Sequence, residues 1–169
     1  MQKVRRGGRG AAPARRRPLA TPEFALAQSI AAWLAASVIT PKHLLAGVYI
    51  AAWDRLCRLW RDPNAFEELV AQECELPLPR WTYWLEFGKR QRPSGWLIGL
   101  SGEASGVLDA AAALARQRAQ RGGPEELRCE DFLFALASNT RLPLGRLVRA
   151  CGVDMRRLSA ARPQRTRHG

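Results

Sequence analysis

Long apolar runs are missing from this chain of 169 residues. A membrane-spanning helix needs about 18 consecutive apolar residues, whereas the best candidate, 30–39, is short and is closely followed by Lys42 and His43. The segment 18–23 also lacks the apolar core of a signal peptide. We therefore expect a soluble, cytoplasmic protein that makes no use of a membrane.

Metal-binding patterns are missing as well. None of the four cysteines pairs as Cys-x-x-Cys, and the two histidines, His43 and His168, lie far apart in the sequence. This spacing argues against a zinc site. Each cysteine stands among apolar residues, so buried, reduced thiols are expected at four positions: Cys57, Cys74, Cys129 and Cys151.

The side chains that enzymes use do not converge in this sequence. There is no Gly-x-x-x-x-Gly-Lys-Ser/Thr phosphate loop, and no Ser–His–Asp or Cys–His set can be assembled. Glu125-Glu126 and Glu130-Asp131 look like acid/base pairs, but acids near a helix N-terminus are explained by the helix dipole. His43, near a helix start, most simply caps that helix. We expect no enzymatic activity, no catalytic residue, and no cofactor or metal.

Acidic residues are absent from both ends of the chain, and the net charge is +12. Residues 1–19 carry seven basic residues and residues 156–169 carry five, so 20–155 balances 15 basic against 15 acidic residues. Arginine greatly outnumbers lysine, and 5–10 resembles an arginine–glycine RNA-binding tract. Two interpretations stay open. The ends are disordered, solubilising tails, or they hold nucleic acid through phosphate contacts.

Start signals and a period of three to four residues predict a series of helices. Thr21-Pro22-Glu23 begins the first, which we expect to reach Ser37. Thr40-Pro41 begins the second, a long central helix expected over 44–61. Further helices are expected over 65–73, from Ser101 to Gly122, from Cys129 onward, over 144–151 and over 153–158.

The segment 76–100 combines prolines and glycines, which disfavour a long helix, with a concentration of aromatic residues. Alternating apolar residues over 81–87 fit one helical turn and a short strand equally well. The aromatic and basic residues together resemble a base-stacking platform, a packing element or a partner-binding hot spot, and packing is favoured. Trp81 and Trp84 are the candidate partner-binding residues of this segment.

One pattern occurs twice. Val38–Gly47 and Leu127–Leu136 each place an apolar residue, a cap-like residue and a polar pair ahead of an apolar helix face. An alanine-rich amphipathic segment precedes each copy, at 24–36 and at 106–118. Two copies are too few for a solenoid. We therefore expect an all-α bundle of two tandem, pseudo-symmetric helical repeats with a seam between the halves.

These residues resemble the Clp N-terminal repeat domain of AAA+ unfoldases and their stand-alone relatives. That domain has two four-helix repeats, each with an apolar-x-Thr-Glu-His-Leu-Leu motif and a closing Gly-Val-Asp-x-x-x-Leu. Here the motif corresponds to 39–45 and 127–133, and the closing element to Gly152–Leu158. The resemblance covers residues 21–158 and is stronger in the second half.

The resemblance implies a non-enzymatic module that docks substrates, adaptors or degradation tags for an ATPase ring. Some members bind phosphoarginine with the motif glutamate of each repeat, and this chain has Glu130 at one such position but Lys42 at the other. A lysine repels a guanidinium and attracts a phosphate or an acidic peptide, so a symmetric phosphoarginine site is not expected. The two motifs contribute the remaining candidate partner-binding residues: Lys42, His43, Glu130 and Asp131.

The sequence thus predicts a disordered basic tail over 1–20, a double-repeat domain over 21–158 and a basic tail over 159–169. Within the domain, repeat one spans 21–75, the Trp-rich connector 76–100 and repeat two 101–158. The expected function is protein or peptide binding in the Clp protease and chaperone system, with a Clp ATPase, a peptidase or its substrates as partners. The alternative is a small nucleic-acid-associated helical protein that binds through its arginine-rich tails.

Overall fold

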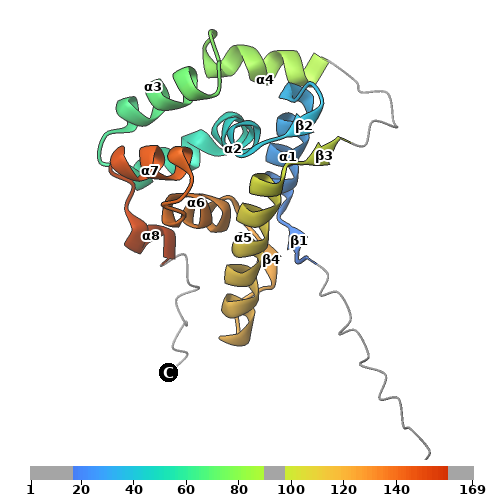
Figure 1. Ribbon diagram of the computed structural model, residues 1–169, viewed down its shortest axis with the longest axis vertical. Coiled ribbons are helices and arrows are strands. Elements are labelled where there is room, and N and C mark those ends of the chain that lie inside the picture. Colours follow the sequence, from blue (N-terminus) through green and yellow to red (C-terminus); the bar gives the residue numbers. More distant parts are fainter. Residues whose placement is uncertain (1–16, 90–97, 160–169) are drawn as a thin grey trace, which may run out of the picture.

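The computed structural model describes residues 17–89 and 98–159 and shows an all-α protein, which confirms the expected fold class (Figure 1). The helices of the first half are α1 Pro22–Leu34, α2 Pro41–Leu56, α3 Pro63–Glu73 and α4 Arg80–Lys89. Those of the second half are α5 Gly102–Gln120, α6 Cys129–Ser138, α7 Pro143–Ala150 and α8 Met155–Ser159. Most of both expected tails lies outside the described residues.

The helices begin where the capping signals predict. The Thr21 hydroxyl accepts a hydrogen bond from the backbone N–H of Phe24 at 3.3 Å, and Ser101 caps α5 in the same way. Asp62 accepts two backbone N–H groups at the start of α3. Proline stands in the first turn of α1, α2, α3 and α7. Backbone N–H groups in the first turn have no acceptor within the helix, so the lack of an N–H on proline costs no hydrogen bond there.

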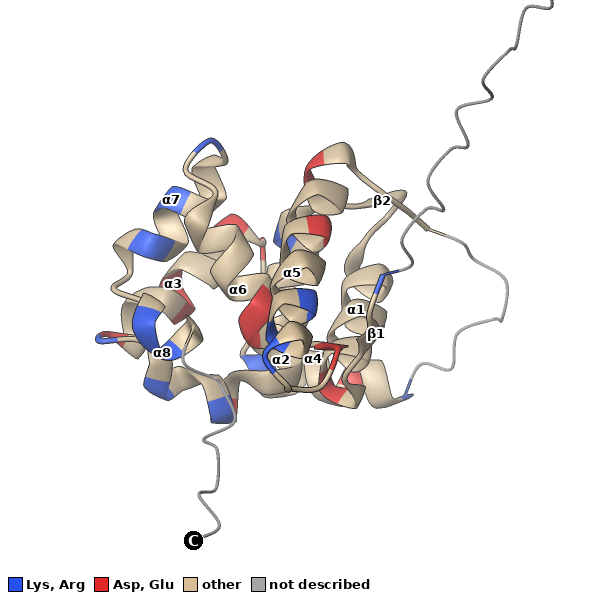
Figure 2. Ribbon diagram, turned by 90° about the horizontal axis from the view of Figure 1, so that it is seen from below, with Lys and Arg blue, Asp and Glu red and all other residues tan. Residues whose placement is uncertain are grey.

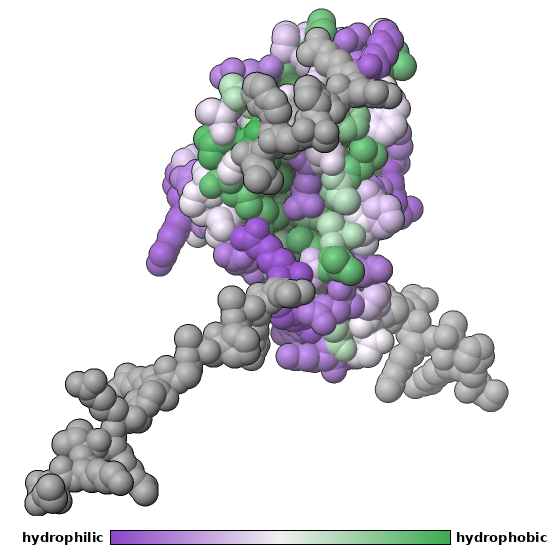
Figure 3. Space-filling model, turned by 90° about the vertical axis from the view of Figure 1, so that its right-hand side faces the viewer, coloured by the Kyte–Doolittle hydropathy of each residue, from purple (hydrophilic) through white to green (hydrophobic). Residues whose placement is uncertain are grey.

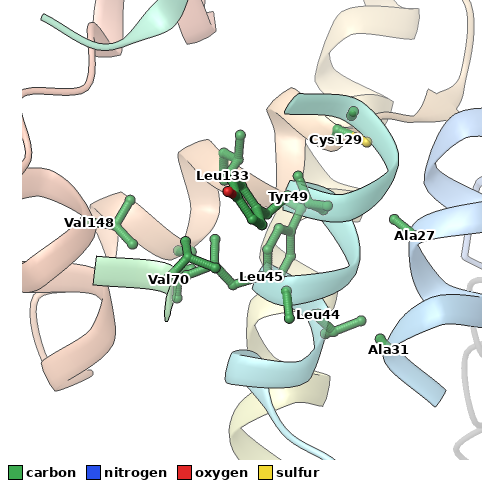
Figure 4. Packing of buried hydrophobic residues seen from close by; sticks show 14 of the residues in the cluster. Ala27, Ala31, Leu44, Leu45, Tyr49, Val70, Cys129, Leu133 and Val148 are labelled. Carbon is green, nitrogen blue, oxygen red and sulfur yellow. The ribbon is translucent and has the colours of Figure 1, made fainter. Parts of the chain in front are cut away.

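The core lies where α1, α2 and α6 meet, and α2 is buried over most of its circumference, as expected for a central helix. A Cβ atom on Gly47 would stand 2.1 Å from the carbonyl oxygen of Ala27, so the absence of a side chain lets α2 approach α1 closely. Phe24 of α1 packs on Phe132 of α6 with ring centroids 6.0 Å apart. Figure 4 shows the core side chains of α1, α2, α3, α6 and α7 converging in this region.

Two pairs of two-residue strands join the halves of the chain. Strand β1 (Leu19–Ala20) pairs in parallel with β4 (Glu126–Leu127), and β2 (Val38–Ile39) pairs in parallel with β3 (Gly99–Leu100). The sequence pattern did not predict these strands. The boundary of the N-terminal tail is also corrected: residues 17–20, assigned to a disordered tail, belong to the fold, because β1 is paired and Arg17 forms an ion pair with Asp109 at 2.8 Å.

Matching contacts occur in the two halves. Each half has the order strand, helix, strand, helix, and each strand of one half pairs with a strand of the other. The second helix of each half is capped alike: His43 Nδ1 accepts the backbone N–H of Thr40 at 3.1 Å, and Asp131 accepts that of Arg128 at 3.0 Å. These matches favour the two-repeat arrangement, which itself stays a prediction.

Other local predictions are settled or corrected. The segment 81–87, left open between helix and strand, lies in helix α4. Helix α2 ends at Leu56 instead of continuing to Arg61, because a 3₁₀ turn over Cys57–Leu59 leads into an extended Trp60. The cysteines are all free, but only Cys129 is buried; the other three are half-buried, which corrects the expectation of four buried thiols.

The surface of the described residues carries apolar side chains in two regions. Figure 3 shows apolar residues gathered in the upper half of the side where α1 lies beside β2 and β3. The other region is α4 with the segment before it. Within residues 17–89 and 98–159, no helix combines the length and apolarity that crossing a membrane would need.

Candidate functional site: a groove between α2, α3 and α4

An open groove of about 660 Å³ lies between α2, α3 and α4, and we call it the acidic groove. Helix α2 contributes one wall, α3 a second, and the proline-containing segment 76–79 with the start of α4 a third. Its lining includes these residues: Tyr49, Trp53, Asp54, Glu67, Glu68, Leu76, Leu78, Arg80 and Trp81. Three carboxylates and one guanidinium thus face the same space, beside a large apolar surface.

Tyr49 and Trp53 form the floor of the acidic groove, belong to an aromatic cluster and hold a carboxylate. Trp53 stacks on Phe66 with ring centroids 5.1 Å apart, and Trp60 lies 4.0 Å from the same ring. Trp53 Nε1 donates a hydrogen bond to Glu67 at 2.6 Å, and the Tyr49 hydroxyl donates to the same carboxylate at 3.3 Å. Burial, and after it the charge of Glu67, together raise the pKa of Tyr49 to about 12, so the phenol stays a donor at neutral pH. Glu67 is therefore fixed in position.

The rim of the acidic groove carries charged side chains and exposed apolar surface. Arg80 forms an ion pair with Asp54 and donates a hydrogen bond to the carbonyl of Ile50. Both partners belong to α2, so these contacts hold the Arg80 side chain against that helix. Glu68 is exposed and has no ion-pair partner among the described residues. The exposed fraction of Trp81, at the opposite edge, is 63%. A cation that enters next to Trp81 therefore meets Glu67 and Glu68 without displacing an existing partner of Glu68.

Helix α4 has two apolar faces. Tyr83 and Phe87 face the core, where Phe87 meets Trp33 with ring centroids 5.8 Å apart. On the opposite face, Trp81, Trp84 and Leu85 follow a helical spacing and stay exposed, with Trp84 at 44% and Leu85 at 50%. Exposed tryptophans on one helix face are common anchors of protein interfaces. The prediction that the aromatic segment packs on the bundle thus holds for one face, while Trp81 and Trp84 remain candidate contact residues.

The four motif residues do not come together at one site. Lys42 is exposed at the first turn of α2 and forms an ion pair with Glu73 at 3.4 Å. Glu130 lies beside Arg55, which is 13 residues further along α2, or about 20 Å at the helical rise per residue. His43 caps α2, as predicted, and burial lowers its pKa although Glu75 opposes this, so the neutral ring can accept its hydrogen bond.

Glu130 and Asp131 are buried carboxylates that are engaged in ion pairs. Arg55 bonds to Glu130 and to Glu23, and so joins α2, α6 and α1. Burial of Glu130 opposes its ionisation, but the hydrogen bond and charge of Arg55 outweigh burial and lower its pKa. Arg118 donates two hydrogen bonds to the carboxylate of Asp131, at 2.6 and 2.9 Å. These carboxylates hold helices together and have little surface left to offer a ligand.

Sequence reasoning missed most of the groove. The four-residue spacing of Tyr49 and Trp53 is a partial signal, since it puts both side chains on one face of α2. Nothing in the local sequence marks Glu67 or Arg80, because their roles depend on helices that are distant along the chain. Among the described residues, no group of three or more metal-ligating side chains could hold an ion. The chain matches no family model and no curated protein.

Proposed function

We propose that this chain is a non-enzymatic binding module that captures a protein segment in the acidic groove. The preferred segment carries an arginine or lysine next to a large apolar side chain. One observation carries the proposal: a fixed carboxylate, Glu67, lies on an aromatic floor, with the unpaired Glu68 and the exposed Trp81 at the rim. The carboxylates favour a cation, and the aromatic side chains take the apolar neighbour.

The chemistry of the described residues supports binding over catalysis. Burial raises the pKa of the Cys74 thiol to about 12 and also raises the pKa of Cys129 and Cys151, so these thiols are protonated at neutral pH and poor nucleophiles. His43 is used as a helix cap. The resemblance to Clp N-terminal repeat domains extends the proposal to a partner: the captured segment belongs to a substrate or adaptor of the Clp protease and chaperone system.

Binding is tested with three labelled peptides of equal length and apolar content, which carry arginine, glutamine or glutamate at the same positions. Fluorescence anisotropy should rank them arginine, glutamine, glutamate. Trp81→Ala should weaken every peptide about tenfold or more, as expected for an aromatic anchor. Glu68→Gln should weaken only the arginine peptide, by about threefold, as expected for an exposed ion pair.

Glu103→Gln is the matched control, because Glu103 is an exposed carboxylate in the first turn of α5, outside the groove lining. It should leave all three affinities unchanged. Equal affinities for the three peptides, or normal binding by Trp81→Ala, would refute the groove as the site. The Clp assignment is tested separately. The protein should be retained on a purified Clp ATPase ring, and Trp81→Ala should abolish this retention. Peptide binding without such retention would reject the Clp role alone.

A further inference from the structure

Five exposed arginines lie within four residues of a backbone bridge at the end of the molecule formed by α7 and α8, and we call them the arginine surface: Arg58, Arg61, Arg149, Arg156 and Arg157. Trp60 and Val153 form an antiparallel bridge. Arg61 N–H donates to the carbonyl of Gly152 at 3.2 Å. These bonds place the segment after α2 against the turn between α7 and α8, which are distant in sequence.

Side-chain contacts draw the arginines closer. A guanidinium nitrogen of Arg157 donates to the backbone carbonyl of Arg58 at 3.3 Å. A Cβ atom on Gly152 would lie 3.5 Å from the side chain of Arg61, so Arg61 lies directly over that turn. Figure 2 shows the basic segments of α7 and α8 along the same side of the molecule. The two parts of the chain that carry these arginines are thus in contact.

The acids in this region are already engaged. Asp62 accepts the first N–H groups of α3, and Asp154 accepts the backbone N–H groups of Arg156 and Arg157. Asp154 also forms an ion pair with Arg157 at 3.4 Å. Among the described residues, no carboxylate pairs with the side chains of Arg58, Arg61, Arg149 or Arg156. From 132 to 159 the chain has five arginines and one acid, so the arginine surface keeps an excess of positive charge.

We propose that the arginine surface binds the phosphate backbone of a nucleic acid. The guanidinium fork suits phosphate oxygens, and several exposed guanidinium groups within a short reach can contact successive phosphates. In the sequence, residues 160–169 follow α8 and include Arg162, Arg165 and Arg167 without any acid. An anionic membrane fits less well, because Leu147 is the only exposed large apolar residue described on α7 and α8.

This surface is separate from the acidic groove. The groove is lined by α2, α3 and α4, whereas the arginine surface belongs to α7, α8 and the segment between α2 and α3. Figure 1 places α4 and α8 at opposite sides of the fold. The described residues therefore carry two surfaces of opposite charge. The proposal does not depend on peptide binding and can fail or succeed separately.

The test uses the full chain, with both tails, and a fluorescein-labelled RNA of about 20 uridines over a series of salt concentrations. The variant Arg58→Gln/Arg61→Gln/Arg156→Gln removes three charges from the arginine surface. The control Lys89→Gln/Arg116→Gln/Arg121→Gln removes three charges elsewhere. The surface variant should bind about tenfold more weakly, and its salt slope should fall by about 2, at about 0.7 per phosphate contact for a single strand. The control should change affinity by less than about threefold.

Equal losses in the two triple variants would overturn the proposal, because they would show that only total charge matters. Unchanged binding by the surface variant would overturn it too, since the tails would then suffice. Loss of binding to phosphatidylserine vesicles but not to RNA would assign the surface to membranes instead. Thermal unfolding checks that the triple variant is folded. If its melting temperature is lowered, the single variants Arg58→Gln and Arg156→Gln take its place, and each must lower the salt slope of RNA binding.

Discussion

At the scale of single residues, Arg55 links three helices, because it bonds from α2 to Glu23 of α1 and Glu130 of α6 together. Glu130→Gln should destabilise the fold by about 1–3 kcal/mol, a value reduced from that of a fully buried pair because Arg55 is partly exposed. The pKa of Glu130 is lower in the folded state, so its stabilisation is complete above the unfolded pKa of about 4.3 and is lost as pH falls through the folded value. Urea unfolding between neutral and acidic pH measures both effects. A Glu130→Gln variant with the same acid sensitivity as the parent would contradict this role.

Gly47 provides a second test at this scale. Its missing side chain lets α2 contact the carbonyl of Ala27, so Gly47→Ala should destabilise the protein by about 2 kcal/mol or more through overpacking. Gly106→Ala is the matched control, since nothing lies within 4 Å of a Cβ atom there. It should stabilise helix α5 by up to about 1 kcal/mol, the difference in helix propensity. Thermal unfolding should therefore show a lower melting temperature for Gly47→Ala and a higher one for Gly106→Ala. Two shifts of the same sign would contradict the packing argument.

At the scale of elements, α4 shows why the sequence left helix and strand undecided. Trp81, Tyr83, Leu85 and Phe87 alternate, which is the pattern of a half-buried strand, but they do so because α4 has one apolar face toward the core and another toward solvent. A helix with two apolar faces has no single helical period. Start signals were more informative: the caps at Thr21, Asp62 and Ser101 act locally, so the sequence alone located these helices.

The two faces of α4 respond differently to truncation. Phe87→Ala should destabilise the fold by about 1–3 kcal/mol, because Phe87 packs against Trp33. Trp84→Ala should change stability by less than about 0.5 kcal/mol, since the side chain is exposed. It should also weaken peptide binding, because Trp84 lies on the same exposed face of α4 as Trp81. Chemical denaturation and the peptide titration together separate these outcomes. A large stability loss in Trp84→Ala would show that this face is structural.

At the scale of the whole molecule, the parts that escaped prediction are those that need distant segments to meet. Two-residue parallel strands have no periodicity, and their partners are set by how the halves pack. The acidic groove assembles Glu67 and Arg80 with α2 in the same way. Motif matching led instead to Glu130 and Asp131, which the fold uses as buried ion-pair partners. A charged residue at a motif position can be read from sequence, but its burial cannot.

The same interdependence predicts that neither half folds alone. Strands β1 and β2 find partners only in the second half, and Arg55 of α2 needs Glu130 of α6. One hydrophobic cluster also includes buried residues of both halves, so separation would expose apolar surface on each. Fragments 1–93 and 94–169 should each show little helix by circular dichroism, and mixing them should restore helicity and a cooperative unfolding transition. A first fragment that unfolds cooperatively alone would mean that α1 to α4 form an independent unit, and the strand pairs would then be secondary contacts between two finished halves.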